Sequence, residues 1–213
     1  MTNYFSQIGQ DQYYIEKISK YKKGGIFLDI GANDGIYTSN TAALEFYYGW
    51  TGICIEANPK LIQVLQKNRP KSTVVNCAVW SVPGTIDLEI PLNNFKGVQG
   101  NLLSRITGLE RNENYFKKHF SHETEKVSVE SKTATSIILE HLLQPIVIDY
   151  ASIDTEGCEI EVLKSIDFNN IDIKFMTIEH GDRPGYIEEF LKYLSPFGYK
   201  LHRINQWDVE FIK

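Results

Sequence analysis

Several features are scarce or missing in this 213-residue sequence, and each absence excludes a class of protein. The three cysteines are odd in number and widely spaced, which argues against a disulfide framework or a zinc site and fits reduced thiols in the cytoplasm. No lysine or arginine cluster is long enough to follow a phosphate backbone, and the net charge is −5, so no nucleic-acid partner is expected. No apolar run approaches the roughly 20 residues of a membrane span. The first residues have neither a basic start nor an apolar core, so no signal peptide is expected.

What the sequence contains is a regular alternation of strand-like and helix-like patterns. Hydrophobic residues make up 42% of the chain and charged residues 23%, as in a globular protein. The expected core strands cover 26–30, 51–56, 73–78, 149–154 and 173–180, the expected helices cover 36–48, 59–69, 133–143, 158–166 and 184–195, and a hairpin turns around 204–206. This order predicts one α/β domain over residues 1–213, with a mainly parallel sheet and an antiparallel edge.

The pattern changes in the middle of the chain. Residues 85–90 and 126–130 alternate between apolar and polar positions, and between them lies a polar, irregular insert at about 92–125. A loop of this length in a compact domain is usually functional, so we expect the insert to form the rim of a binding site, together with an N-terminal cap segment, 1–24. The mixture of amide, guanidinium and phenol groups in the insert suits a hydroxyl-rich ligand such as a carbohydrate.

The stretch IFLDIGANDG, residues 26–35, connects an apolar run to a loop with two glycines. A phosphate-binding P-loop requires a lysine after its last glycine, and none follows Gly35. A dinucleotide loop begins with glycine, whereas Asp29 stands in that place, and Asp34 would bring a negative charge close to the phosphates. An NAD(P)-dependent oxidoreductase is therefore the less favoured alternative.

S-adenosylmethionine (SAM) suits this loop better, because it has no phosphate and carries a cationic ammonium group. Asp29 ends the first expected strand and suits that cation, and Gly31 lets the backbone pass close to a ligand. Glu56 ends the second expected strand, where an acid can accept hydrogen bonds from both ribose hydroxyls. A tight strand-to-helix turn that binds nothing is the alternative interpretation.

Several segments together resemble the FkbM-type methyltransferases. The segments FLDIGANDG, CIEANP, NCAVW and SIDTEGCEIEVLKSIDF follow the family's order and spacing, and SQIGQDQY is similar to its usual opening. The resemblance covers nearly the whole chain. It implies a class I, Rossmann-like SAM-dependent methyltransferase fold, whose seven strands lie in the order 3-2-1-4-5-7-6 with the last strand antiparallel. It also implies methyl transfer to a hydroxyl of a carbohydrate, in a glycan or a sugar-containing natural product, while small-molecule and protein acceptors stay open.

The resemblance also implies which residues bind the cofactor. Glu56 would bind the ribose, and Gln7, Gln10 and Asp11 would fold over the pocket, although helix capping is an equal alternative for these three. The other implied contacts are Asp29, Gly31, Asn33, Asp34 and Gly35 at the methionine end, and Ala57, Asn58, Cys77 and Ala78 around the adenine.

The catalytic groups are expected where the fourth and fifth strands end. Asp154 ends one strand and is followed closely by Glu156, and Glu179 and His180 end the next strand. Ligands of open α/β sheets bind at the carboxyl ends of the strands, so these side chains should meet beside the methyl group. A positioned base accelerates such a transfer by about 10²–10⁴-fold, and His180 has the most suitable ordinary pKa. The alternative role for His180 is that of a structural histidine held by hydrogen bonds.

A metal-dependent interpretation of the same three residues stays open beside the metal-free one. Two close carboxylates repel each other unless a cation or a proton lies between them. Asp154, Glu179 and His180 offer the ligands that Mg²⁺ or Mn²⁺ accepts, and the ion would lower the pKa of the acceptor hydroxyl. A module that keeps the fold without catalysis is a third alternative, against which the intact loop and the strand-end acids argue.

Overall fold

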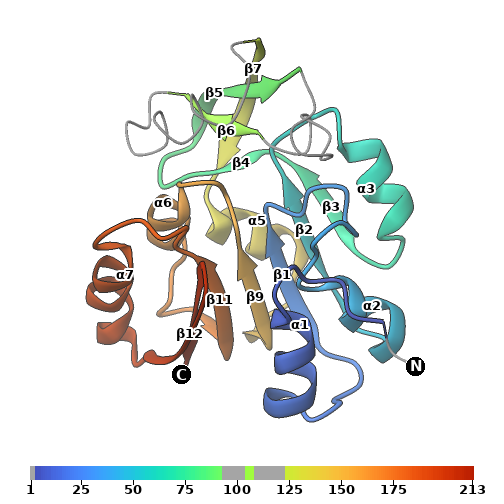
Figure 1. Ribbon diagram of the computed structural model, residues 1–213, viewed down its shortest axis with the longest axis vertical. Coiled ribbons are helices and arrows are strands. Elements are labelled where there is room, and N and C mark those ends of the chain that lie inside the picture. Colours follow the sequence, from blue (N-terminus) through green and yellow to red (C-terminus); the bar gives the residue numbers. More distant parts are fainter. Residues whose placement is uncertain (1–2, 93–103, 108–122) are drawn as a thin grey trace.

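The computed structural model describes residues 3–92, 104–107 and 123–213, which are built around a seven-stranded sheet (Figure 1). The strands lie in the order β3-β2-β1-β9-β11-β13-β12, and β13 is antiparallel to both of its neighbours. The seven strands are β1 (Ile26–Ile30), β2 (Thr51–Glu56), β3 (Thr73–Asn76), β9 (Tyr150–Ile153), β11 (Phe175–Glu179), β12 (Lys200–Asn205) and β13 (Asp208–Ile212). Numbered along the chain, this order is 3-2-1-4-5-7-6, as the sequence predicts.

Two smaller sheets were not predicted. Four strands form the sheet β4-β7-β5-β6, drawn above the large sheet in Figure 1, and two form a parallel pair, β10-β8. Their bounds are β4 (Ala78–Val79), β5 (Gly84–Pro91), β6 (Arg105–Ile106), β7 (Thr124–Lys132), β8 (Ile146–Ile148) and β10 (Ile171–Ile173). The prediction of one strand over 73–78 is wrong, because the chain leaves the large sheet at Cys77 and enters the small one at Ala78.

The predicted insert at 92–125 is described only in part. Residues 93–103 and 108–122 lie outside the described residues, so the prediction for them stays a prediction. The described parts belong to strands: β6 pairs with β5, and β7 begins at Thr124. The small sheet therefore extends into the segment that the sequence analysis treats as irregular.

Helices cover both faces of the large sheet, so its central strands are apolar on both sides. In β1, Phe27 packs with Trp50 on one face, whereas Leu28 and Ile30 join the core on the other face. The helical segments are α1 (Gln10–Tyr13), the π-helix η1 (Tyr14–Ile18), α2 (Ala42–Tyr48), α3 (Ile62–Asn68), α5 (Ala134–His141), α6 (Glu159–Lys164), α7 (Tyr186–Leu194) and the 3₁₀-helix η3 (Ser195–Phe197).

The prediction of a helix over 36–48 is wrong in its first half. Asp34 Oδ1 accepts hydrogen bonds from the backbone N–H groups of Ile36 and Tyr37, which holds the chain in a turn. Ser39 Oγ accepts from the N–H groups of Thr41 and Ala42, so α2 begins at Ala42. Residues 36–41 are therefore a loop at the end of β1, where a ligand of this sheet would bind.

The N-terminal segment lies against this loop and against the C-terminal hairpin. Ser6 forms an isolated parallel bridge with Thr38, and Gln10 Nε2 donates a hydrogen bond to Asp208. Asp11 accepts hydrogen bonds from the N–H groups of Phe5 and Ser6, so its side chain holds the start of the segment. These contacts bring residues from the two ends of the sequence to the same edge of the sheet.

Candidate functional site

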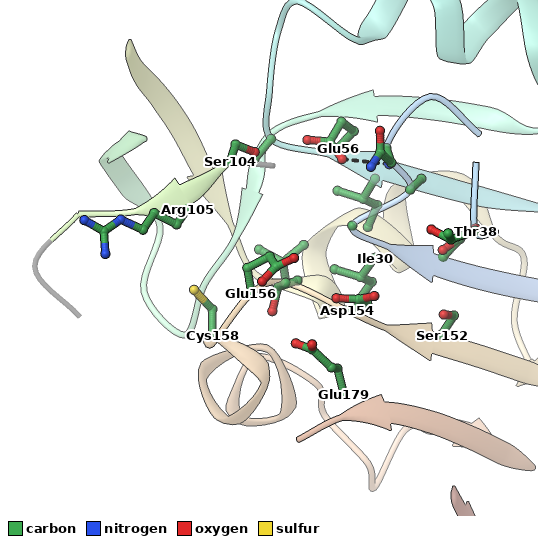
Figure 2. Close-up of a pocket in the computed structure, with 18 of the residues that line it drawn as sticks. Ile30, Thr38, Glu56, Ser104, Arg105, Ser152, Asp154, Glu156, Cys158 and Glu179 are labelled. Atoms are coloured by element: carbon green, nitrogen blue, oxygen red, sulfur yellow. Dashed lines mark hydrogen bonds between the residues drawn. The ribbon is translucent and has the colours of Figure 1, made fainter. Parts of the chain in front are cut away.

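A cavity of about 630 Å³ lies at the carboxyl ends of the large-sheet strands (Figure 2). This volume falls in the range of small-molecule and cofactor sites. The small sheet supplies one wall through Leu88 and Ile106, and Trp207 reaches the cavity from the turn between β12 and β13. The cavity therefore lies at the sheet edge where the sequence analysis expects ligand binding.

Most of the predicted site residues line this cavity. They lie in or next to strands at one edge of the large sheet, or in the N-terminal segment. The predicted residues that line it are Gln7, Asp29, Gly31, Asn33, Glu56, Ala57, Cys77, Ala78, Asp154 and Glu179.

Other predicted site residues shape the cavity loops without lining the cavity. Asp34 and Asp11 accept backbone hydrogen bonds in their own segments. Asn58 is buried, and its Oδ1 accepts from the N–H of Lys60. At Gly35, which has φ +85°, an added Cβ would lie 2.6 Å from Arg69 Cγ, so glycine is required there by packing.

His180 also lies outside the residues that line the cavity. Its side chain is 5% exposed, and its Nδ1 accepts a hydrogen bond of 3.2 Å from the N–H of Asp182. The backbone N–H of His180 donates to the carbonyl of Trp207. Nε2 of His180 is buried and has no hydrogen-bond partner among the described residues, so the choice between a structural and a catalytic histidine stays open. The strand-end carboxylates of Asp154 and Glu179 do line the cavity.

Gly31 has a clear reason to be glycine. An added Cβ would lie 1.7 Å from the carbonyl oxygen of Asp154, and the residue has φ +86°. The loop after β1 therefore passes directly against the end of β9. The sequence analysis explains this glycine by a close approach to a ligand, whereas the close approach in the structure is to backbone.

Glu56 is buried at the end of β2, and its carboxylate joins two loops. Oε2 accepts from the N–H of Asn33 at 2.8 Å, and Oε1 accepts from the N–H of Asn58 at 2.7 Å. Burial raises the pKa of Glu56, and these backbone N–H groups oppose the increase. Each carboxylate oxygen has two lone pairs, so each can accept a further hydrogen bond from a hydroxyl group.

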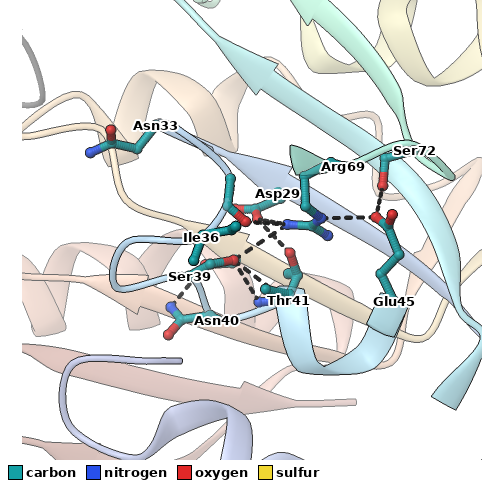
Figure 3. A network of polar contacts seen from close by, with 12 residues as sticks. Asp29, Asn33, Ile36, Ser39, Asn40, Thr41, Glu45, Arg69 and Ser72 are labelled. Carbon is teal, nitrogen blue, oxygen red and sulfur yellow. Dashed lines mark hydrogen bonds and ion pairs between the residues drawn. The ribbon is translucent and has the colours of Figure 1, made fainter. Parts of the chain in front are cut away.

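Asp29 belongs to a buried polar network centred on Arg69 (Figure 3). Arg69 Nη1 lies 3.6 Å from Asp29 Oδ2, and Arg69 Nε donates to Glu45 Oε2 at 2.8 Å. Nη1 also donates to the Gly35 carbonyl and to Ser39 Oγ, both at 3.3 Å. The network holds the glycine loop and α2 in place, and it neutralises much of the Asp29 charge.

Four acidic side chains gather at the ends of β9 and β11. Asp154, Glu156 and Glu179 line the cavity, and Glu159 is fully buried beside them. Burial raises the pKa of Asp154 and of Glu179 well above their ordinary values, and mutual repulsion raises both further. The pKa of Glu156 is also raised by burial, and Arg183 opposes the increase. Asp154 is exposed toward the cavity, so it is the accessible member of the cluster.

Arg183 provides the positive charge that the metal-dependent interpretation assigns to a divalent ion. Its Nη1 lies 3.4 Å from Glu159 Oε2 and 3.5 Å from Glu179 Oε2. Among the described residues, no three histidine, cysteine, aspartate or glutamate side chains are arranged to hold a metal ion. Asp154, Glu179 and His180 therefore do not form the predicted ligand set.

Backbone strain is concentrated around the cavity. Asn33, Thr38, Glu156 and Asp182 line it, and their φ angles lie between +53° and +56°. Thr38 is the most unusual, because a β-branched residue rarely adopts this conformation. Each such residue costs about 1–3 kcal/mol and is typical of ligand-binding sites.

Sequence reasoning missed several lining residues. Arg183 looks like an ordinary loop cation, and Trp207 looks like a surface residue of a hairpin turn. Asn40 and Ser152 lie inside segments predicted as helix and strand, where single polar residues give no functional signal. The additional lining residues with polar or aromatic side chains include Tyr37, Thr38, Ser39, Asn40, Ser104, Arg105, Ser152, Thr155, Asp182, Arg183 and Trp207.

Asp208 lies behind the acid cluster and gives a prediction for stability. Burial raises the pKa of Asp208 to about 6 despite the hydrogen bond from Gln10. The ionised carboxylate therefore destabilises the fold above pH 6, and the penalty disappears as the pH falls toward the ordinary value. Asp208→Asn, which keeps an acceptor for Gln10, should raise the free energy of unfolding by about 1–3 kcal/mol at pH 8 and by much less at pH 4.5.

Urea unfolding at both pH values measures this effect, and Asp172 provides a control of opposite sign. A hydrogen bond from Lys174 lowers the pKa of Asp172, so its ionised form stabilises the fold. Asp172→Asn should therefore reduce stability at pH 8. A gain for Asp208→Asn that is equal at both pH values would show that ionisation is not its cause.

The charges around the cavity define the kind of ligand that fits. Among the described lining residues, the acids are Asp29, Glu56, Asp154, Glu156, Glu179 and Asp182, and the only basic side chains are Arg105 and Arg183. Arg105 pairs with Glu89, and Arg183 with the acid cluster. A cavity of this charge favours a cationic ligand and disfavours a pyrophosphate. The fold and the site thus define an α/β protein whose described cavity lining suits a ligand with positive charge.

The comparison with protein families places the chain more narrowly. Residues 29–201 match the model of the methyltransferase FkbM domain. Because this match covers most of the sequence, the chain belongs to the FkbM methyltransferase family, as the sequence motifs predict. No match was found among curated proteins.

Solved structures support the fold. The FkbM methyltransferase from Methylobacillus flagellatus KT is 14% identical with a TM-score of 0.58, and the match covers 98% of this chain and 48% of that one. The METTL16 methyltransferase domain is 11% identical with a TM-score of 0.50, covering 95% and 64%. The chain thus spans about half the length of the Methylobacillus protein.

Within the described part of the chain, no helix has the length and apolarity to cross a membrane.

Proposed function

We propose that the protein is a SAM-dependent O-methyltransferase that acts on a hydroxyl group of a carbohydrate. The observation that carries this proposal is the acid-lined cavity, which has Glu56 at the end of β2 and Asp154 at the end of β9. The family supplies the reaction type, and the cavity suggests which residue has each role.

The residues around the cavity fit SAM. Glu56 is held by two backbone N–H groups and keeps acceptor capacity for the ribose hydroxyls. Cys77 and Ala78 lie where the chain passes between the two sheets and offer a small apolar surface to the adenine. SAM supplies an activated methyl group on a sulfonium, and its net positive charge complements the acids around it.

Asp154 is the proposed general base. Its carboxylate faces the cavity, and its raised pKa makes it a better proton acceptor than an ordinary aspartate. Asp154 would take the proton of the acceptor hydroxyl as the oxygen forms its bond to the methyl carbon. Burial and the nearby charge of Glu156 would keep the pKa of this base raised, and the positive charge of Arg183 would limit the increase.

The side chains near the cavity mouth support a carbohydrate acceptor. Trp207 and Tyr37 both line the cavity and are 40% and 45% exposed, so their faces are available to a sugar ring. Gln7 and Asp182 add polar groups that can bind hydroxyls. The amide-rich residues 93–103 lie outside the described residues, so their part in the rim stays a prediction.

The test combines cofactor binding with a panel of acceptors. Titration calorimetry should show one SAM bound per chain, and Glu56→Ala should weaken the binding by about 1.5–3 kcal/mol through lost charged hydrogen bonds. Mass spectrometry should then detect a gain of one methyl group on a glycan or free sugar. Binding of NAD(P) in place of SAM would favour the oxidoreductase alternative, and methylation of only peptides or flat apolar compounds would overturn the carbohydrate assignment.

A further inference from the structure

Asn40 lines the cavity and has a buried polar atom without a partner in the described part of the chain. Its side chain is 8% exposed and lines the cavity, and within the described residues its Oδ1 has no hydrogen-bond partner. Its Nδ2 donates to Ser152 Oγ at 3.0 Å, which anchors the amide to β9. Buried acceptors are nearly always paired in folded proteins, so this oxygen is expected to receive a donor from a bound ligand.

The surroundings indicate the charge of that donor. Ser152 lies directly opposite Asp29 in the register of β9 and β1, so Asn40 is anchored beside the Asp29 carboxylate. Asp29 Oδ2 already accepts from Thr41 Oγ1 and lies near Arg69 (Figure 3). A ligand carboxylate would be repelled here, whereas an ammonium group would gain from both the Asn40 oxygen and the residual negative charge.

We propose that Asn40 Oδ1 accepts a hydrogen bond from the α-ammonium group of SAM and thereby orients the methionine arm. This inference rests on the proposed function, because it assigns a role within the SAM site. Asn40 lies in the loop before α2, whose start is held by Ser39. The loop conformation, with Thr38 at φ +53°, therefore has a function: it brings the amide over the end of the sheet.

The experiment compares ligands that differ at one group. Titration calorimetry is performed with S-adenosylhomocysteine and with its analogues that lack either the amino or the carboxyl group. The wild-type protein should bind the analogue without the amino group about 10- to 100-fold more weakly, as expected for a hydrogen bond to a charged group. Asn40→Leu should bind S-adenosylhomocysteine more weakly and lose most of this discrimination.

Two further variants separate binding from folding. Asn68→Leu is the matched control, because the Asn68 side chain donates a hydrogen bond to the carbonyl of Asp34 but does not line the cavity. The Asn68→Leu protein should discriminate against the analogue without the amino group as strongly as the wild type does. Asn40→Asp keeps an acceptor oxygen and should retain or increase the preference for the ammonium group, which covers the case in which Asn40→Leu folds poorly.

The results that would overturn the proposal are distinct. If a folded Asn40→Leu protein still bound the analogue without the amino group as weakly, relative to S-adenosylhomocysteine, as the wild type does, Asn40 would not bind the ammonium group. Discrimination lost only against the analogue without the carboxyl group would mean that the amide has the opposite orientation, with Nδ2 binding the ligand carboxylate. A wild-type protein that bound no S-adenosylhomocysteine would reject the SAM site itself together with this role of Asn40.

Discussion

Asp154→Asn should reduce the rate of methyl transfer by about 10²–10⁴-fold while the protein still binds SAM. The variant keeps the size and the backbone contacts of Asp154, but an amide cannot accept the hydroxyl proton. Because burial and the Glu156 charge raise the pKa of Asp154 well above its ordinary value, the wild-type rate should rise with pH as that group ionises. This rise should disappear in the variant. Single-turnover rates over a range of pH measure both effects.

Asp182→Asn is the matched control for this substitution. Asp182 is another exposed carboxylate of the same cavity, but it lies in the loop after β11 and not at the end of β9. Its replacement should change acceptor affinity more than the transfer rate. If Asp154→Asn retained the wild-type rate and pH profile, the base would be a different group, and Glu179 at the end of the neighbouring strand would be examined next.

The large sheet was predictable because its signals are local. The central strands are short apolar runs, and an acid that lines the cavity lies next to the last residue of β1, as Asp29 does, or at the last residue of β2, as Glu56 does. The small sheet was not predictable, because its strands pair with segments that are distant in the sequence, as Gly84 does with Ser131. Local alternation in such segments indicates a strand but does not indicate its partner.

The acids at the strand ends of the site were predictable, whereas the roles of its buried polar residues were not. The acids that end strands could be placed from the known position of ligands in α/β sheets. His180 could not be told from Asp154 as a base, because only the fold decides which of two strand-end groups faces the cavity. Arg69 resembles a solvent-exposed base at the end of a helix, and its burial depends on contacts with β1 and α2 that no sequence pattern shows.

Arg69 carries the largest expected effect on stability. Its side chain is 0% exposed, and its guanidinium lies between two carboxylates that are also buried, those of Asp29 and Glu45 (Figure 3). Arg69→Met fills a similar volume but leaves both carboxylates without their cation. Removing one partner of a buried ion pair typically costs about 3–5 kcal/mol, so the free energy of unfolding should fall by that amount.

The pH dependence of Arg69→Met distinguishes electrostatics from packing. In the wild-type protein, burial raises the pKa of Asp29 and the positive charge of Arg69 opposes this increase. Without Arg69, the folded-state pKa of Asp29 should therefore rise further. The loss of stability should then be largest at pH 8 and should become smaller as the pH falls and Asp29 takes up a proton. A triple variant that adds Asp29→Asn and Glu45→Gln should recover much of the loss at pH 8. An equal loss at both pH values, without recovery in the triple variant, would mean that Arg69 acts through packing against Phe27 and Gly35.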